Sequence, residues 1–111
     1  MHLANGAAMD GWIRALLLSL TAVTLASTVV LARSSTIEIN VDLIGSDYWD
    51  FPDRSGSPQF CQRICVGEPT CVAWTFVRKG VRGSRAARCW MKNQVPQEKK
   101  GDPCCVSGVI Q

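Results

Sequence analysis

Six cysteines have the greatest capacity for chemistry in this chain, because a thiol can form a disulfide, bind a metal or act as a redox group. They are Cys61, Cys65, Cys71, Cys89, Cys104 and Cys105. The gaps between the first three do not match the two-residue gap of common zinc ligand pairs. The adjacent Cys104 and Cys105 lack the two-residue spacer of redox enzymes. The sequence therefore predicts disulfides and no metal site, with the pairing left open.

Histidine chemistry is excluded from most of the chain, because the one histidine is His2. Nucleophiles of the Ser-His-Asp and Cys-His types have no base between residues 33 and 111. Asp47, Asp50 and Asp53 are spaced three apart, but no full loop of oxygen ligands for calcium surrounds them, so they are read as turn residues. We expect no enzyme activity, no metal and no cofactor.

An uncharged, apolar stretch from residue 15 to residue 32 predicts an export signal that is cleaved after Ala32. The alternative is an uncleaved anchor, since a bilayer is spanned by roughly 17–25 residues. Cysteine usage agrees with export, because small oxidised domains add cross-links where the core is small. The 111 residues divide into a signal peptide or signal anchor (1–32), a linker (33–36) and one folded domain (37–111).

A basic loop between residues 78 and 88 is one candidate binding surface. Its cations are Arg78, Lys79, Arg82, Arg85 and Arg88, with no acid among them. This composition suits a sulfated or carboxylated polysaccharide or an acidic protein. The alternative is a solvated hairpin loop whose charges prevent edge aggregation. Nucleic acid is not expected, because no second basic strip or stacking pattern accompanies the loop.

Aromatic residues supply the second candidate surface. Tyr48 and Trp49 fall in a loop-like stretch, so Trp49 is the aromatic residue most expected at a binding surface, although it can also pack over a helix. Trp74 and Trp90, on strands expected to be neighbours, can form a stacking platform for sugar rings. The commoner outcome for two tryptophans in so small a domain is burial in the core.

The secondary-structure pattern predicts an α+β domain. Residues 37–43 alternate apolar and polar, which predicts a strand with Ile37, Ile39, Val41 and Leu43 on one face. Ser57 as a cap and Pro58 predict a short helix over 58–66, ended by a left-handed Gly67. Further strands are predicted at 71–77, 89–92 and 104–110, with a loop or short edge segment at 48–51, a polar connection at 93–103, and the last strand weakened or bulged at Gly108.

In this order the motifs resemble the PAN/apple family, in its short exported form. The matching elements are Asp47-Tyr48, Cys61-x3-Cys65-x5-Cys71, Ala73-Trp74-Thr75-Phe76, Cys89-Trp90-Met91-Lys92 and the segment 105–109, so the resemblance covers about residues 37–110. It implies a curled antiparallel sheet packed around one short helix. It also implies that Cys61 pairs with Cys89, and Cys65 with Cys71.

The chain departs from fuller apple domains because no cysteine precedes Cys61. Cys104 and Cys105 therefore lack the N-terminal partner of those domains. They can join each other, stay free or link to a second chain. A bond between them is strained, because adjacent α-carbons are about 3.8 Å apart, below the usual disulfide range.

Two functional hypotheses follow. As the resemblance implies, the first is an exported, non-catalytic module that binds protein or carbohydrate, with an anionic ligand as one option. The second is a membrane-anchored or disulfide-linked structural or assembly module. In both cases the domain is expected outside the cytoplasm, secreted into the extracellular space or the periplasm, or held there by an uncleaved anchor.

Overall fold

The computed structural model describes residues 20–27 and 33–111. The chain divides into two units, Met1–Val30 and Leu31–Gln111. In the first unit, residues Leu20–Ala22 form a single 3-10 turn, η1. Most of the predicted export segment lies outside the described residues. Within the described ranges, no helix has the length and apolar character needed to cross a membrane.

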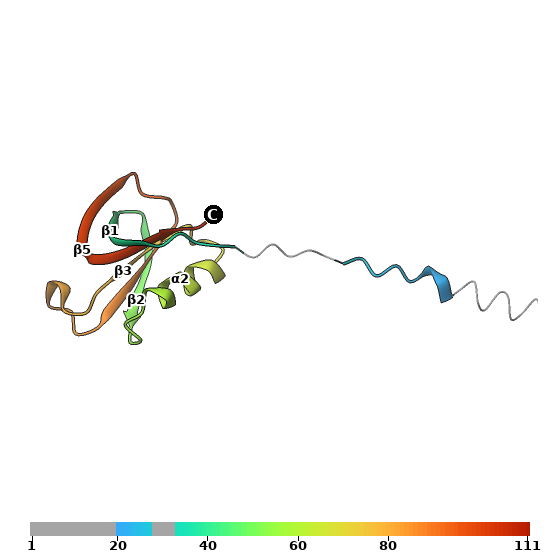
Figure 1. The fold of residues 1–111 in the computed structure, drawn as a ribbon, viewed down its shortest axis with the longest axis horizontal. Coiled ribbons are helices and arrows are strands. Elements are labelled where there is room, and N and C mark those ends of the chain that lie inside the picture. Colours follow the sequence, from blue (N-terminus) through green and yellow to red (C-terminus); the bar gives the residue numbers. More distant parts are fainter. Residues whose placement is uncertain (1–19, 28–32) are drawn as a thin grey trace, which may run out of the picture. The chain divides into compact units, whose positions relative to one another are not determined.

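The second unit contains a five-stranded antiparallel sheet and one α-helix (Figure 1). Along the chain the elements are β1 (Glu38–Ile44), β2 (Asp47–Asp53), α2 (Pro58–Gly67), β3 (Ala73–Val77), η2 (Val81–Gly83), β4 (Ala87–Lys92) and β5 (Glu98–Val109). The strand order across the sheet is β1-β5-β3-β4-β2. This arrangement confirms the predicted α+β class, with the predicted hairpin formed by β3 and β4.

The connection between β1 and β2 forces the sheet to curl. These strands are the two edges of the sheet, yet only Gly45 and Ser46 join them. Three virtual bonds of about 3.8 Å span at most about 11 Å, whereas the edges of a flat five-stranded sheet are about 19 Å apart. Both turn residues have positive φ, +98° at Gly45 and +61° at Ser46. The curvature is visible along β5 in Figure 1.

One face of the sheet packs against α2 and forms the core. Cys61 and Cys65 of the helix are fully buried there, over a floor of Trp74, Phe76, Cys89, Met91 and Val106. Disulfides join Cys61 to Cys89 and Cys65 to Cys71, the pairs that the family resemblance implies. In the chain-entropy model, loops of these lengths contribute about 3.6 and 2.4 kcal/mol. The helix is therefore attached covalently both to the sheet and to the segment that leads into β3.

A bulge between β1 and β5 breaks the predicted alternation of apolar side chains. Ile39 pairs with Val106 and Val41 pairs with Gly101, so Asn40 alone lies opposite residues 102–105 of β5. Asn40 adopts a left-handed conformation, with φ of +59°. The prediction that the four apolar residues of the first strand share one face is therefore wrong. Ile37 and Ile39 are 43% and 69% exposed, whereas Leu43 is buried.

Strand boundaries also differ from the sequence prediction. The last strand begins at Glu98 rather than at residue 104, because polar residues 98–101 pair with residues 41–44 of β1. The aromatic stretch at residues 48–51 lies within β2, an edge strand that tolerates Pro52 because the proline leaves no donor unpaired inside the sheet.

The two ends of α2 are held differently from the prediction. The Ser57 hydroxyl hydrogen-bonds the Gln59 side chain and makes no cap to the backbone. The helix extends through Gly67, which is not left-handed. At the C-terminal end, the Arg33 guanidinium donates to the carbonyls of Val66, Glu68 and Cys71. Such a cation satisfies carbonyls that the end of the helix leaves open.

Gly108 is a packing requirement rather than the weak point that the sequence suggested. A Cβ at this position would lie 2.2 Å from the Thr36 carbonyl oxygen and 2.5 Å from Trp74 Nε1. Trp74 is fully buried, and its Nε1 donates to Ser35 Oγ at 2.8 Å. A side chain at residue 108 would therefore displace both the indole and the segment before β1.

We predict that Gly108→Ala destabilises the domain by about 3 kcal/mol, because overpacking a filled core has this magnitude. The expected fall in Tm is roughly 12–24 °C for a domain of this size. Thermal unfolding followed by circular dichroism measures it. Gly101→Ala, in the same strand with nothing within 4 Å of the added Cβ, is the matched control. Equal Tm values for the two variants would contradict this account of Gly108.

Candidate functional site

The face of the sheet opposite α2 holds a pocket of about 250 Å³. Side chains alternate along a strand, so Thr75, Val77 and Trp90 point away from the core formed by Trp74, Phe76 and Met91. The pocket is lined by Asp42, Leu43, Ile44, Gly45, Asp47, Thr75, Val77, Val81, Arg82, Trp90, Lys92, Asp102, Cys104 and Cys105. All five strands contribute, so the pocket is a direct product of the curl.

A buried cation lines the pocket. Lys92 is 2% exposed, and its Nζ donates to the Gly45 carbonyl oxygen at 2.9 Å and to Asp47 Oδ1 at 2.5 Å. A buried ammonium group needs such partners, since an unpaired buried charge is strongly destabilising. The Asn93 amide donates to the Ser46 carbonyl oxygen at 3.1 Å beside it. These bonds attach β4 to the turn that joins the two edge strands.

Asp42 is the carboxylate of the pocket without a structural partner. No hydrogen bond or ion pair holds its side chain among the described residues. Burial raises the pKa of Asp42 above its ordinary value of 3.8, and the charges of Asp102 and Asp47 act in the same direction. Lys92 and Arg82 oppose this rise in the pKa. The carboxylate is thus partly desolvated and free to accept hydrogen bonds from a ligand.

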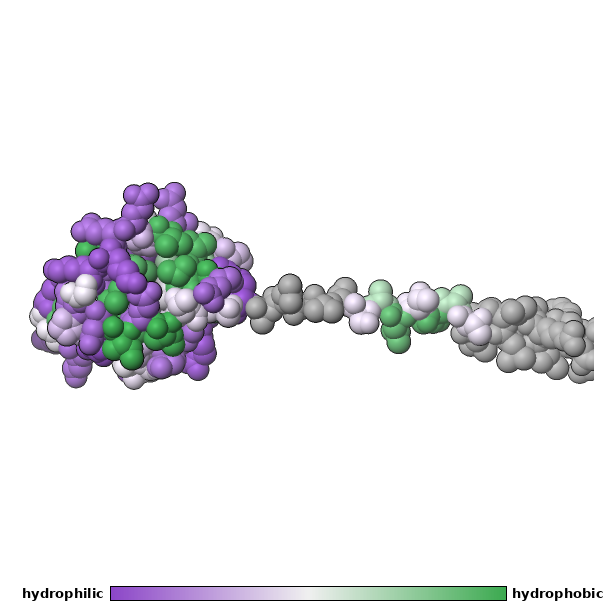
Figure 2. All heavy atoms as spheres, turned by 45° about the horizontal axis from the view of Figure 1, so that its top comes forward, coloured by the Kyte–Doolittle hydropathy of each residue, from purple (hydrophilic) through white to green (hydrophobic). Residues whose placement is uncertain are grey.

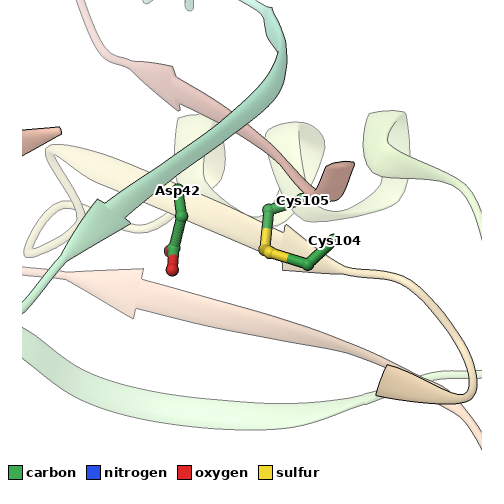
Figure 3. A group of neighbouring side chains, drawn as sticks. All are labelled: Asp42, Cys104 and Cys105. Carbon is green, nitrogen blue, oxygen red and sulfur yellow. A yellow bond between two sulfur atoms is a disulfide. The ribbon is translucent and has the colours of Figure 1, made fainter. Parts of the chain in front are cut away.

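A disulfide between adjacent residues forms part of the pocket wall. Cys104 and Cys105 are bonded to each other within the bulge of β5. A carboxylate oxygen of Asp42 and both sulfur atoms lie within 4.8 Å of one another. Figure 3 shows the Asp42 side chain and the disulfide. A metal would need cysteine thiolates. The oxidised cysteine pair offers no thiolate. In this state Asp42, Cys104 and Cys105 line the pocket and do not form a set of metal ligands.

The two tryptophans named as a sugar platform lie on opposite faces of the sheet. Thr75 pairs with Trp90, whereas Trp74 pairs with Met91. Trp74 is buried in the core, as the commoner outcome predicted, and Trp90 is half-buried in the pocket. The Arg88 guanidinium lies 5.9 Å from the ring centroid of Trp90. One aromatic ring, not two, is therefore presented in the pocket.

The aromatic residues of the predicted 48–51 surface lie apart from the pocket. Trp49 is 45% exposed, with its ring 4.6 Å from that of Phe51 between centroids. Phe51 in turn packs edge-on against Phe60 of α2. Tyr48 packs against the core, where its hydroxyl is buried without a hydrogen bond among the described residues. Burial raises the pKa of Tyr48, and the Glu68 carboxylate adds to that rise.

The basic residues of the predicted loop have separate environments. Arg78 donates to the Pro103 carbonyl oxygen, and Arg88 forms an ion pair with Asp50. Lys79 and Arg85 are exposed. Arg82, which has a positive φ of +55°, is the member of this set that lines the pocket. The structure therefore does not bring the five cations together with Tyr48 and Trp49 in one site.

Sequence reasoning missed Asp42 and Asp102 as site residues. They lie on β1 and β5, about sixty positions apart in the chain, and meet only through the pairing of those strands at the bulge. No local spacing signals this. Figure 2 shows hydrophilic and hydrophobic patches side by side on one face of the unit.

Residues 41–92 match the family model of the PAN domain. This match supports the PAN/apple family that the motif order indicates, and PAN domains are in general non-catalytic binding modules.

One curated relative is an uncharacterized protein of Acanthamoeba polyphaga mimivirus, which is 31% identical over 84 residues. The match covers 75% of this chain and 22% of that protein, so the chain spans about a fifth of the relative's length. No solved structure matches the chain significantly.

We predict that Asp42→Asn raises the Tm at pH 7 but not at pH 3. Because the pKa of Asp42 is raised in the folded state, ionised Asp42 destabilises the fold. This penalty appears only when the pH is above the ordinary pKa of an aspartate carboxyl group. At pH 3 the side chain is largely protonated in both states, so the amide brings no gain. Thermal unfolding of both proteins at the two pH values measures the effect.

Asp50→Asn is the control, because Asp50 is held by Arg88 and its neutralisation brings no gain at either pH. A lower Tm for Asp42→Asn than for the parent protein at pH 7 would show that Asp42 has a stabilising partner.

Proposed function

We propose that this protein is a non-catalytic carbohydrate-binding module that receives one sugar residue in the concave pocket. The observation that carries the proposal is the half-buried Trp90 ring in the same pocket as the Asp42 carboxylate, which no other described residue holds. The apolar face of a pyranose ring stacks on an aromatic ring. Its hydroxyl groups donate charge-assisted hydrogen bonds to carboxylates.

The charges around the pocket favour a neutral, hydroxyl-bearing ligand. Asp42 and Asp102 supply acceptors, while Arg82 supplies donors. A cationic ligand meets repulsion from Arg82, and an anionic ligand meets repulsion from the carboxylates. A hydroxyl group both donates and accepts, so it can satisfy either sign.

The dimensions of the pocket support a small ligand. Its volume of about 250 Å³ is just below the range of roughly 300–1,000 Å³ that is usual for small-molecule sites. This space suits a single sugar ring, at the end of a glycan or as a free monosaccharide. An anionic polysaccharide on the basic loop stays a prediction of the sequence.

The proposal places the domain outside the cytoplasm, where its three disulfides would persist. The apolar stretch at residues 15–32 supports export. A cross-linked assembly module is less favoured, because all six cysteines are paired within the chain.

The test is binding of the purified protein to a printed array of neutral and acidic glycans, followed by calorimetry with the best free sugar. We expect selective retention of neutral glycans. Trp90→Ala should lower the affinity by about tenfold or more, since it removes the stacking surface. Asp42→Ala should do the same by removing an ionised acceptor, and it provides a second variant if Trp90→Ala is poorly folded.

Trp49→Ala is the matched control, because this tryptophan lies against Phe51 and outside the pocket. It should bind as the parent protein does. Retention of no glycan, or equal affinity for the parent and Asp42→Ala, would overturn the proposal and favour a protein ligand.

A further inference from the structure

The six cysteines differ sharply in accessibility. Cys61, Cys65, Cys71 and Cys89 are 0% exposed, and Cys105 is 1% exposed. Cys104 is half-buried and lines the open pocket. Thiol–disulfide exchange requires a thiolate to reach a sulfur atom of the bond. The Cys104–Cys105 bond is therefore the one that a dissolved thiol can approach while the domain remains folded.

The three bonds also differ in what they hold. Cys61–Cys89 and Cys65–Cys71 close loops with sequence separations of 28 and 6. Cys104–Cys105 joins neighbouring residues, so it removes almost no loop entropy from the unfolded chain. Around it, backbone hydrogen bonds keep β5 in place, including that from the Arg78 amide to the Cys104 carbonyl oxygen at 2.9 Å. Opening this bond leaves the structural links intact.

We propose that the Cys104–Cys105 disulfide is a thiol–disulfide exchange site, which external thiols and dithiols reduce while the two other disulfides stay closed. A thiolate of the dithiol attacks one cysteine sulfur, the bond between the cysteines breaks, and the departing cysteine takes up a proton. The second thiol of the dithiol, or a second molecule of a monothiol, then attacks the reagent sulfur of the mixed disulfide and releases the first cysteine as a thiol. The reagent leaves as a disulfide, and both electrons come from it.

Asp42 gives the site a preference among thiols. Its carboxylate oxygen lies within 4.8 Å of both sulfur atoms (Figure 3). Asp102 and Asp47 add negative charge around the pocket, while Lys92 and Arg82 oppose it. Neutralising Asp42 removes one negative charge near the reacting bond whatever the other groups contribute. The rate of reduction by an anionic thiol should therefore rise more on this change than the rate with a cationic thiol.

The first experiment treats the oxidised full chain with limiting dithiothreitol in native buffer, followed by iodoacetamide and peptide mass spectrometry. We expect two labels, on Cys104 and Cys105, at least tenfold faster than on any other cysteine. The circular dichroism spectrum should not change. The double variant Cys104→Ser/Cys105→Ser should fold and take up no label under the same conditions. Equal labelling of all six cysteines, or none at Cys104 and Cys105, would overturn the proposal.

The second experiment compares reduction by cysteamine, which is positively charged, with reduction by mercaptoethanesulfonate, which is negatively charged. In Asp42→Asn the ratio of the two rates should shift about threefold towards the anionic thiol. Asp50→Asn, whose carboxylate pairs with Arg88, should leave the ratio unchanged. A ratio that is the same in the parent and in Asp42→Asn would refute the role of Asp42.

Discussion

The curl of the sheet is the constraint on which the rest of this structure depends. Two edge strands that a flat sheet would hold far apart are joined by Gly45 and Ser46 alone. The buried Lys92 ammonium group donates hydrogen bonds to the Gly45 carbonyl and the Asp47 carboxylate, and these bonds stabilise the turn between the two edge strands. Removal of the Asp47 carboxylate would leave the buried Lys92 charge without its ion-pair partner, so turn, ion pair and curvature depend on one another.

Curvature divides the domain into two faces with different roles. The face towards α2 is filled by apolar side chains and crossed by two disulfides, which compensate for the small core of so short a chain. The opposite face is concave and keeps polar and aromatic groups around a pocket. Alternate residues of the same strand therefore point into the core and into the pocket. A pocket residue and a core residue can be neighbours in sequence, as Trp90 and Met91 are.

The bulge of β5 links the polypeptide geometry to the chemistry of the pocket. Four residues of β5 lie opposite one residue of β1, and this excess places the Cys104–Cys105 pair at the pocket wall beside Asp42. Bulges commonly re-aim side chains next to functional sites. The match to the PAN domain model, over residues 41–92, covers α2 and the strands β2, β3 and β4.

Local patterns in the sequence determined the α+β class, the short helix after Pro58, the central aromatic strand and its hairpin partner, because these depend on nearby residues. The motif order also indicated the family, through cysteines and aromatic residues at set spacings. The exposure of Ile39, the early start of β5 and the need for Gly108 depended on strand pairing and on Trp74, which lie far along the chain. Tertiary structure alone decided the pocket, because its residues come from five strands that only curvature brings together.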